Sequence, residues 1–184
     1  RQPFKLCVPG SSPGGPSMKV ERKFGFFDTI LSMNDNKCIL FAGVTGSSKT
    51  PIATYLSYHL GLPIFNNDAI RSEVAEDLGI FNQQEYEKRR DERGKRLIAS
   101  HRSFIYDASI DREWLRLKEG LDNEHYGYFI ISLDLGMEMV KKMYQVKEYN
   151  ESLTMIDRLI NDHKTFLEQN NELVNLHITD DIFN

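Results

Sequence analysis

The chain has 184 residues, of which 40% are hydrophobic and 27% charged, and its formal net charge at pH 7 is -4. This length favours one domain with its own hydrophobic core, and the mildly acidic balance argues against general nucleic-acid binding. No apolar stretch reaches the roughly 18 to 20 residues that cross a bilayer, no signal peptide is visible, and there are only two cysteines, so we expect a cytoplasmic protein with no membrane partner.

The first 17 residues differ in composition from the rest of the chain. Four of the six prolines fall there, among glycines and serines. This composition predicts a flexible leader, or a remnant of the expression vector, in residues 1–17 and a single domain in residues 18–184. An apolar cluster within residues 18–32 is expected to form a short helix or strand that packs on this domain.

From residue 37 onward, short apolar runs typical of buried parallel strands alternate with segments that carry apolar residues at helical spacing. This alternation predicts βαβ units around a parallel sheet, that is, an α/β fold. The expected strands are residues 38–43, 62–65, 103–107, 126–133 and 173–178. The expected helices are residues 50–60, 68–78, 83–101, 111–121, 137–147 and 152–169.

The loops that follow the first four strands should meet at one edge of this sheet. Ligands of open parallel sheets bind at the carboxyl ends of the strands, which directs attention to residues 43–50, 66–71 and 107–112 and to the segment after Asp134. Asp68 is predicted to be the N-cap of the helix expected at residues 68–78, and Asp111 stands at the start of the helix expected at residues 111–121.

The segment GVTGSSKT joins the first strand to the first helix and has the character of a phosphate loop. In the pattern G-x-x-x-x-G-K-[ST], inward backbone N–H groups and a helix N-terminus bind phosphates, the lysine reaches the β- and γ-phosphates, and the last hydroxyl binds Mg²⁺. Here Ser48 replaces the second glycine, while Gly46 supplies flexibility. The alternative is a chance match in an ordinary turn. The residues expected to hold a nucleoside triphosphate are Gly43, Val44, Thr45, Gly46, Ser47, Ser48, Lys49 and Thr50.

Two further stretches follow the phosphate loop in order: HLGLPIFNNDAIRSEV at residues 59–74 and HRSFIYDASIDREWLRL at residues 101–117. With them, residues 38 to about 163 resemble small P-loop kinases such as polynucleotide 5′-kinases, gluconate kinases, chloramphenicol phosphotransferases and zeta toxins. The resemblance implies a P-loop NTPase fold of the nucleotide-kinase type, a three-layer α/β/α sandwich with a parallel five-stranded sheet. It also implies ATP and Mg²⁺ as cofactors.

Five catalytic residues are predicted. Lys49 is one of them, and the resemblance assigns roles to the other four. Asp68 would orient or deprotonate the acceptor hydroxyl, and Arg71, one turn later, would hold an anionic group of the acceptor. Asp107 would bind Mg²⁺, with Thr50, or the substrate, and Arg112 would bind substrate. The alternatives are a helix cap for Asp68, a turn residue for Asp107, a solvated arginine for Arg71 and a surface salt bridge for Arg112.

The expected lid helix departs from the pattern of these kinases, whose lids carry arginines that stabilise the transition state. It contains Lys141, Lys142 and Lys147 and no arginine, and the next arginine is Arg158. Lysine cannot make the bidentate contacts of arginine. Either the lysines substitute, or Arg158 reaches the site, or catalysis is slow or absent.

Together, these patterns predict an ATP- and Mg²⁺-dependent kinase that phosphorylates a hydroxyl of a small molecule or a nucleotide. A nucleotide-binding regulatory module and an NTPase without a dedicated acceptor are the alternatives. The expected helix at 83–101 is rich in both basic and acidic residues. It reads as a solvated, salt-bridged face, or otherwise as an edge that recognises a polyanionic acceptor.

Overall fold

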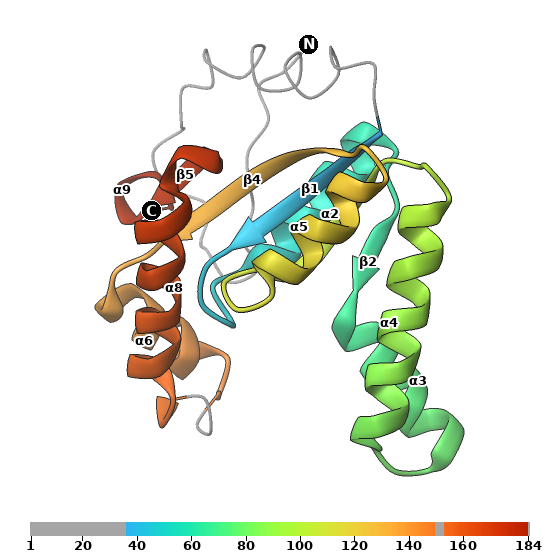
Figure 1. The fold of residues 1–184 in the computed structure, drawn as a ribbon. Helices are drawn as coiled ribbons and strands as arrows, with labels where there is room; N and C mark the ends of the chain where they lie inside the picture. The colour runs from blue at the N-terminus through green and yellow to red at the C-terminus, as the bar shows by residue number, and fades with distance from the viewer. Residues whose placement is uncertain (1–35, 150–152, 184) are drawn as a thin grey trace. The chain divides into compact units, whose positions relative to one another are not determined.

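The computed structural model describes residues 36–149 and 153–183, so the segments expected at 1–17 and 18–32 lie outside the described residues. Within these ranges, strands alternate with helices as the sequence predicts (Figure 1). The strands are β1 (Lys37–Ala42), β2 (Ile64–Asn66), β3 (Phe104–Ser109), β4 (Gly127–Asp134) and β5 (Val174–Thr179). The helices are α2 (Lys49–Leu60), α3 (Asn67–Leu78), α4 (Gln83–Ala99), α5 (Trp114–Asn123), α6 (Met137–Val146), α8 (Ile156–Asn170), the 3₁₀ turn Asn171–Leu173 and α9 (Asp180–Phe183).

The strands of the described residues form one five-stranded sheet in the order β2-β3-β1-β4-β5, and every pairing is parallel. The predicted α/β fold with a parallel five-stranded sheet is therefore confirmed. Strand β1 is central, between β3 and β4, so the loop after β1 begins in the middle of the carboxyl edge. Asp107 near the end of β3 and Asp134 at the end of β4 flank that loop.

Strand β1 also forms the centre of the core, since all six of its residues are buried. Its near-continuous apolar sequence fits a strand that is covered on both faces of the sheet. Leu40 of β1 belongs to a cluster that includes Ile130 of β4, Trp114 of α5 and Phe166 of α8. The base of the phosphate loop is thus fixed to the most buried part of the domain.

Helices α3 and α5 begin at other residues than the sequence predicts, for reasons that the structure shows. Asn66, not Asp68, is the N-cap of α3, because its side chain accepts a hydrogen bond from the Ala69 N–H at 2.8 Å. Asp68 is therefore the second residue of the helix, and the prediction that it caps α3 is wrong. Helix α5 starts at Trp114, three residues later than expected, because the Asp111 carboxylate accepts a hydrogen bond from Gly43 instead of capping a helix.

The arginines of α4 are largely engaged by acidic neighbours. Arg89 donates to Glu85 at 2.8 Å and also bonds Asp77, while Arg93 donates to Glu73 at 2.7 Å. The contacts with Asp77 and Glu73 join α4 to α3, which lies beside it (Figure 1). They favour the salt-bridged interpretation of this helix over recognition of a polyanion. Among the described residues, none of the helices has both the length and the apolar character of a membrane span.

Candidate functional site

The loop between β1 and α2 turns through three residues of positive φ. Gly43 has φ 126°, Gly46 has φ 80° and Ser48 has φ 68°. A Cβ atom on Gly43 would lie 3.0 Å from the Leu133 carbonyl oxygen, and one on Gly46 would lie 2.7 Å from the Tyr144 ring. Both glycines are thus required by backbone conformation and by space. The third residue of positive φ is not a glycine but Ser48, whose backbone lies in the left-handed region.

Lys49 is buried against the loop that precedes it. Its Nζ donates to the carbonyl oxygens of Gly43 at 2.9 Å and Val44 at 2.6 Å, and to the Ser47 hydroxyl at 3.3 Å. Burial lowers the pKa of Lys49 to about 8, although the nearby carboxylates of Asp111 and Asp107 act to raise it. The loop therefore curls around its own lysine. Because the pKa of Lys49 is close to neutral pH, a bound phosphate would stabilise the charged form of the amine.

The predicted metal-binding pair is brought together by the sheet. The Thr50 hydroxyl donates to Asp107 Oδ1 at 3.2 Å, and the Asn66 amide donates to Asp107 Oδ2 at 2.7 Å. Asp107 is 7% exposed, and burial raises the pKa of its carboxyl group. A hydroxyl and a carboxylate are oxygen ligands of the kind that Mg²⁺ prefers. The donor set beside the phosphate loop therefore fits this ion.

A buried polar chain links the start of the phosphate loop to β4. The Gly43 N–H donates to Asp111 Oδ1 at 3.1 Å, and His163 of α8 lies between two carboxylates, with Nδ1 3.2 Å from Asp111 and Nε2 3.1 Å from Asp134. Burial acts to lower the pKa of His163, but the hydrogen bonds and charges of the two aspartates outweigh it and raise the pKa to about 9. An imidazolium thus joins α8 to the loop at neutral pH.

Sequence reasoning missed this contribution of His163, and little could have revealed it. His163 is 52 residues from Asp111 and 29 from Asp134. Only the three-dimensional packing of α8 brings the imidazole between them.

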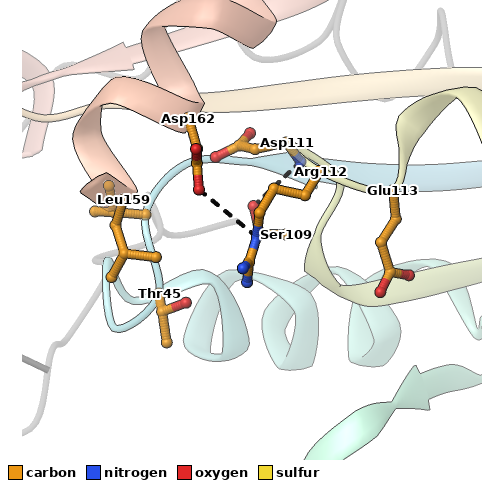
Figure 2. A pocket seen from close by; sticks show the side chains of 8 residues that line it. Thr45, Ser109, Asp111, Arg112, Glu113, Leu159 and Asp162 are labelled. Atoms are coloured by element: carbon orange, nitrogen blue, oxygen red, sulfur yellow. Dashed lines mark hydrogen bonds and ion pairs between the residues drawn. The ribbon is translucent and has the colours of Figure 1, made fainter. Parts of the chain in front are cut away.

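Beside the loop lies a pocket of about 340 Å³ between the β3–α5 connection and α8 (Figure 2). The Arg112 guanidinium points to Asp162, with Nε 3.8 Å from Oδ2. Arg158 approaches the same oxygen, with its Nε at 4.0 Å. Both arginines also border a smaller cavity that reaches Thr45 of the loop. The lining of the larger pocket is Val44, Thr45, Ser109, Asp111, Arg112, Glu113, Leu159 and Asp162.

The two predicted acceptor residues of α3 lie differently. Asp68 is exposed in the first turn and close enough to Asp107 for its charge to add to the effect of burial in raising the pKa of Asp107. Arg71 is also exposed, but its guanidinium stacks on the Phe81 ring at 3.9 Å from the ring centroid. The structure thus places Asp68 at the carboxyl edge of the sheet and engages Arg71 with the turn beyond α3.

Of the three lysines of the expected lid, one contacts the phosphate loop and the other two do not. Lys147 donates to the Gly46 carbonyl at 2.7 Å and to the Ser48 hydroxyl at 3.0 Å, so it contacts the phosphate loop. Lys141 instead bonds Glu138 on its own helix at 3.4 Å, and Lys142 is exposed.

Comparison with known structures identifies the fold. A structure from the PezAT chromosomal toxin–antitoxin system of Streptococcus pneumoniae is similar with a TM-score of 0.58 and 13% identity, over 85% of this chain and 74% of that chain. Shikimate kinase from Aquifex aeolicus is similar with a TM-score of 0.50 and 14% identity, over 77% of this chain and 85% of that chain. No protein-family model and no curated protein matches the chain. At these identities the likeness establishes a P-loop kinase fold, which confirms the resemblance seen in the sequence.

Proposed function

We propose that this chain is a P-loop phosphotransferase that moves the γ-phosphoryl group of ATP to a hydroxyl group of a small molecule or a nucleotide. The observation that carries the proposal is the contact between Thr50 and Asp107 at 3.2 Å, directly beside a loop that curls around the buried Lys49. Metal ligands next to a lysine-bearing phosphate loop are the parts that phosphoryl transfer requires.

On the nucleotide side, the residues would act mainly by holding charge. The N–H groups of the loop and the N-terminus of α2 attract phosphate oxygens. Lys49 exchanges its bonds to the Gly43 and Val44 carbonyls for bonds to the β- and γ-phosphates. Thr50 and Asp107 would hold Mg²⁺, which would supply positive charge to neutralise those phosphates.

On the acceptor side, the pocket beside Thr45 supplies space and charge. A volume of about 340 Å³ is at the lower end of the range for small-molecule sites, which suits an acceptor of metabolite size. Arg112 and Arg158 would neutralise the transferring group or an anionic acceptor, and Asp68 would orient the acceptor hydroxyl. Because Asp162 lies near both guanidinium groups, it would keep them aligned before the acceptor binds.

The direct test measures ADP release from Mg·ATP with and without a panel of acceptors that contains sugars, hydroxy acids, nucleosides and nucleotides. Turnover that depends on an acceptor supports the kinase. Turnover on water alone assigns an NTPase, and tight nucleotide binding without turnover assigns a regulatory module. The same assay with GTP in place of ATP determines the base preference.

A further inference from the structure

Two side chains at the C-terminal end of α6 hold the outer rim of the phosphate loop, Tyr144 in the helix and Lys147 at its C-cap. The Tyr144 hydroxyl donates to the Thr45 carbonyl, and Lys147, three residues later, donates to the Gly46 carbonyl and the Ser48 hydroxyl. Residues three apart lie on the same side of a helix, so the two contacts act together. Lys49 holds the opposite, inner part of the loop through the carbonyls of Gly43 and Val44.

Ser48 adopts a backbone conformation that its side chain disfavours. Its φ of 68° and ψ of 36° are left-handed, in a place where the phosphate-loop pattern has a glycine. A Cβ atom makes this region costly, whereas glycine enters it freely. Ser48 gains no capping bond from its own helix. Its hydroxyl instead meets the ammonium group of Lys147, in a half-buried setting where charge-assisted hydrogen bonds are strong.

We propose that Lys147 is a positioning residue that keeps the phosphate loop in its anion-binding shape and thereby makes a serine tolerable at position 48. It acts through the Ser48 hydroxyl and the Gly46 carbonyl, and its effect on ligand binding rests on the proposed function of the loop. The sequence departs from the pattern twice, with serine for glycine in the loop and lysine for arginine in the lid. The structure joins these two departures in one contact.

Substitution separates this role from that of a simple phosphate-binding cation. Lys147 bonds a loop carbonyl and a serine hydroxyl, as Lys49 does, so the two roles differ in how much they depend on the residue at position 48. A simple cation would contribute equally whichever residue stood at position 48. A positioning residue is needed less once that residue is glycine. Substitutions at the two positions should therefore be strongly coupled.

The test is a mutant cycle on Mg·ATP affinity, measured by calorimetry on the whole chain. We expect Lys147→Met to weaken binding about tenfold beside Ser48 but about threefold or less in a Ser48→Gly background. Ser48→Gly alone should bind at least as tightly as the unsubstituted protein. Ser48→Ala, which keeps the Cβ atom and loses the hydroxyl, should bind Mg·ATP more weakly than the unsubstituted protein. The matched control is Lys95→Met, which removes the same charge from an exposed position on α4.

An equal loss from Lys147→Met with and without the Ser48→Gly substitution would overturn the proposal, as would Ser48→Ala binding as well as Ser48→Gly. The same cycle is measured on urea unfolding of the nucleotide-free protein, where Lys147→Met should destabilise the protein that retains Ser48 more than the Ser48→Gly variant. If the unsubstituted chain binds no nucleotide, the proposed function fails. The unfolding cycle then still supports or refutes the role of Lys147 on its own.

Discussion

The nucleotide side and the acceptor side of the candidate site differ in how firmly their side chains are held. Lys49 and Asp107 are 8% and 7% exposed and make hydrogen bonds of 2.6 to 3.3 Å. The side chains of Arg112 and Arg158 are 59% and 68% exposed and meet Asp162 only at 3.8 and 4.0 Å. The nucleotide side is therefore preorganised to bind charge, whereas the acceptor side has freedom to close on a ligand. Substitutions on the two sides should affect turnover, nucleotide affinity and acceptor use differently.

The largest effect is expected on the preorganised side. Asp107→Asn should lower the turnover of the proposed reaction about 100-fold, because it removes the negative charge that holds Mg²⁺ while keeping the shape of the side chain. ADP release is measured over a titration of Mg²⁺, and excess metal should recover part of the loss. Asp122→Asn, on the exposed face of α5, is the control. Unchanged turnover at every Mg²⁺ concentration would refute the metal site.

Asp68→Asn should separate the acceptor side from the nucleotide side, because it should change turnover and leave ATP affinity nearly unchanged. We expect turnover to fall roughly thirtyfold while ATP affinity changes less than about twofold, because an amide cannot accept the acceptor proton. Single-turnover kinetics and calorimetry measure the two quantities separately. Glu76→Gln, also exposed on α3, is the matched control. If Asp68→Asn leaves transfer intact, Asp68 has no role at the acceptor.

The flexible side is tested by Arg112→Met and Arg158→Met. Each should lower kcat/KM for the acceptor about tenfold and leave ATP affinity nearly unchanged, since these guanidinium groups would act after nucleotide binding. Arg116→Met is the comparison, because the Arg116 side chain is 57% exposed, close to the exposure of Arg112, but bonds Asp91 and Glu113. A loss that is equal for Arg116→Met and Arg112→Met would show that surface charge alone matters.

The smallest effect concerns pH. The pKa of Lys49 is about 8 without ligand, and a neighbouring polyphosphate should raise it, so nucleotide binding takes up a proton above that pH. ATP affinity should be fully present below about pH 7 and fall about fourfold between pH 7 and pH 8.5. Calorimetry in buffers of different ionisation enthalpy detects the proton directly. A Kd that stays constant up to pH 9.5 would contradict the titration of Lys49.

Much of the fold and the nucleotide side could be predicted from the sequence because the signals are local. An apolar run, a glycine-rich turn and a helical pattern define β1, the loop and α2, and parallel strands bring Asp107 to Thr50. What could not be predicted depends on distant partners. Asn66 and Asp68 are both good helix caps, and the structure uses Asn66, whose amide also reaches Asp107 across the sheet. The contact of Lys147 with Ser48 spans 99 residues.

The predicted acceptor residues show the same limit. A helical spacing places Arg71 one turn after Asp68, but it does not reveal Phe81, on which the Arg71 guanidinium stacks. In the same way, sequence spacing could not show that Arg112 and Arg158 converge on Asp162. The roles of these residues therefore stay predictions for the experiments above.

Calorimetric titration of Mg·ATP into the unsubstituted chain and into Lys49→Met tests directly whether the loop binds a polyphosphate. We expect saturable binding with a Kd below about 1 mM for the unsubstituted chain and a loss of affinity of at least about 100-fold for Lys49→Met, because methionine cannot replace a buried ammonium group that faces phosphates. No binding by the unsubstituted chain, or equal affinity in both proteins, would contradict the claim that this loop binds a polyphosphate.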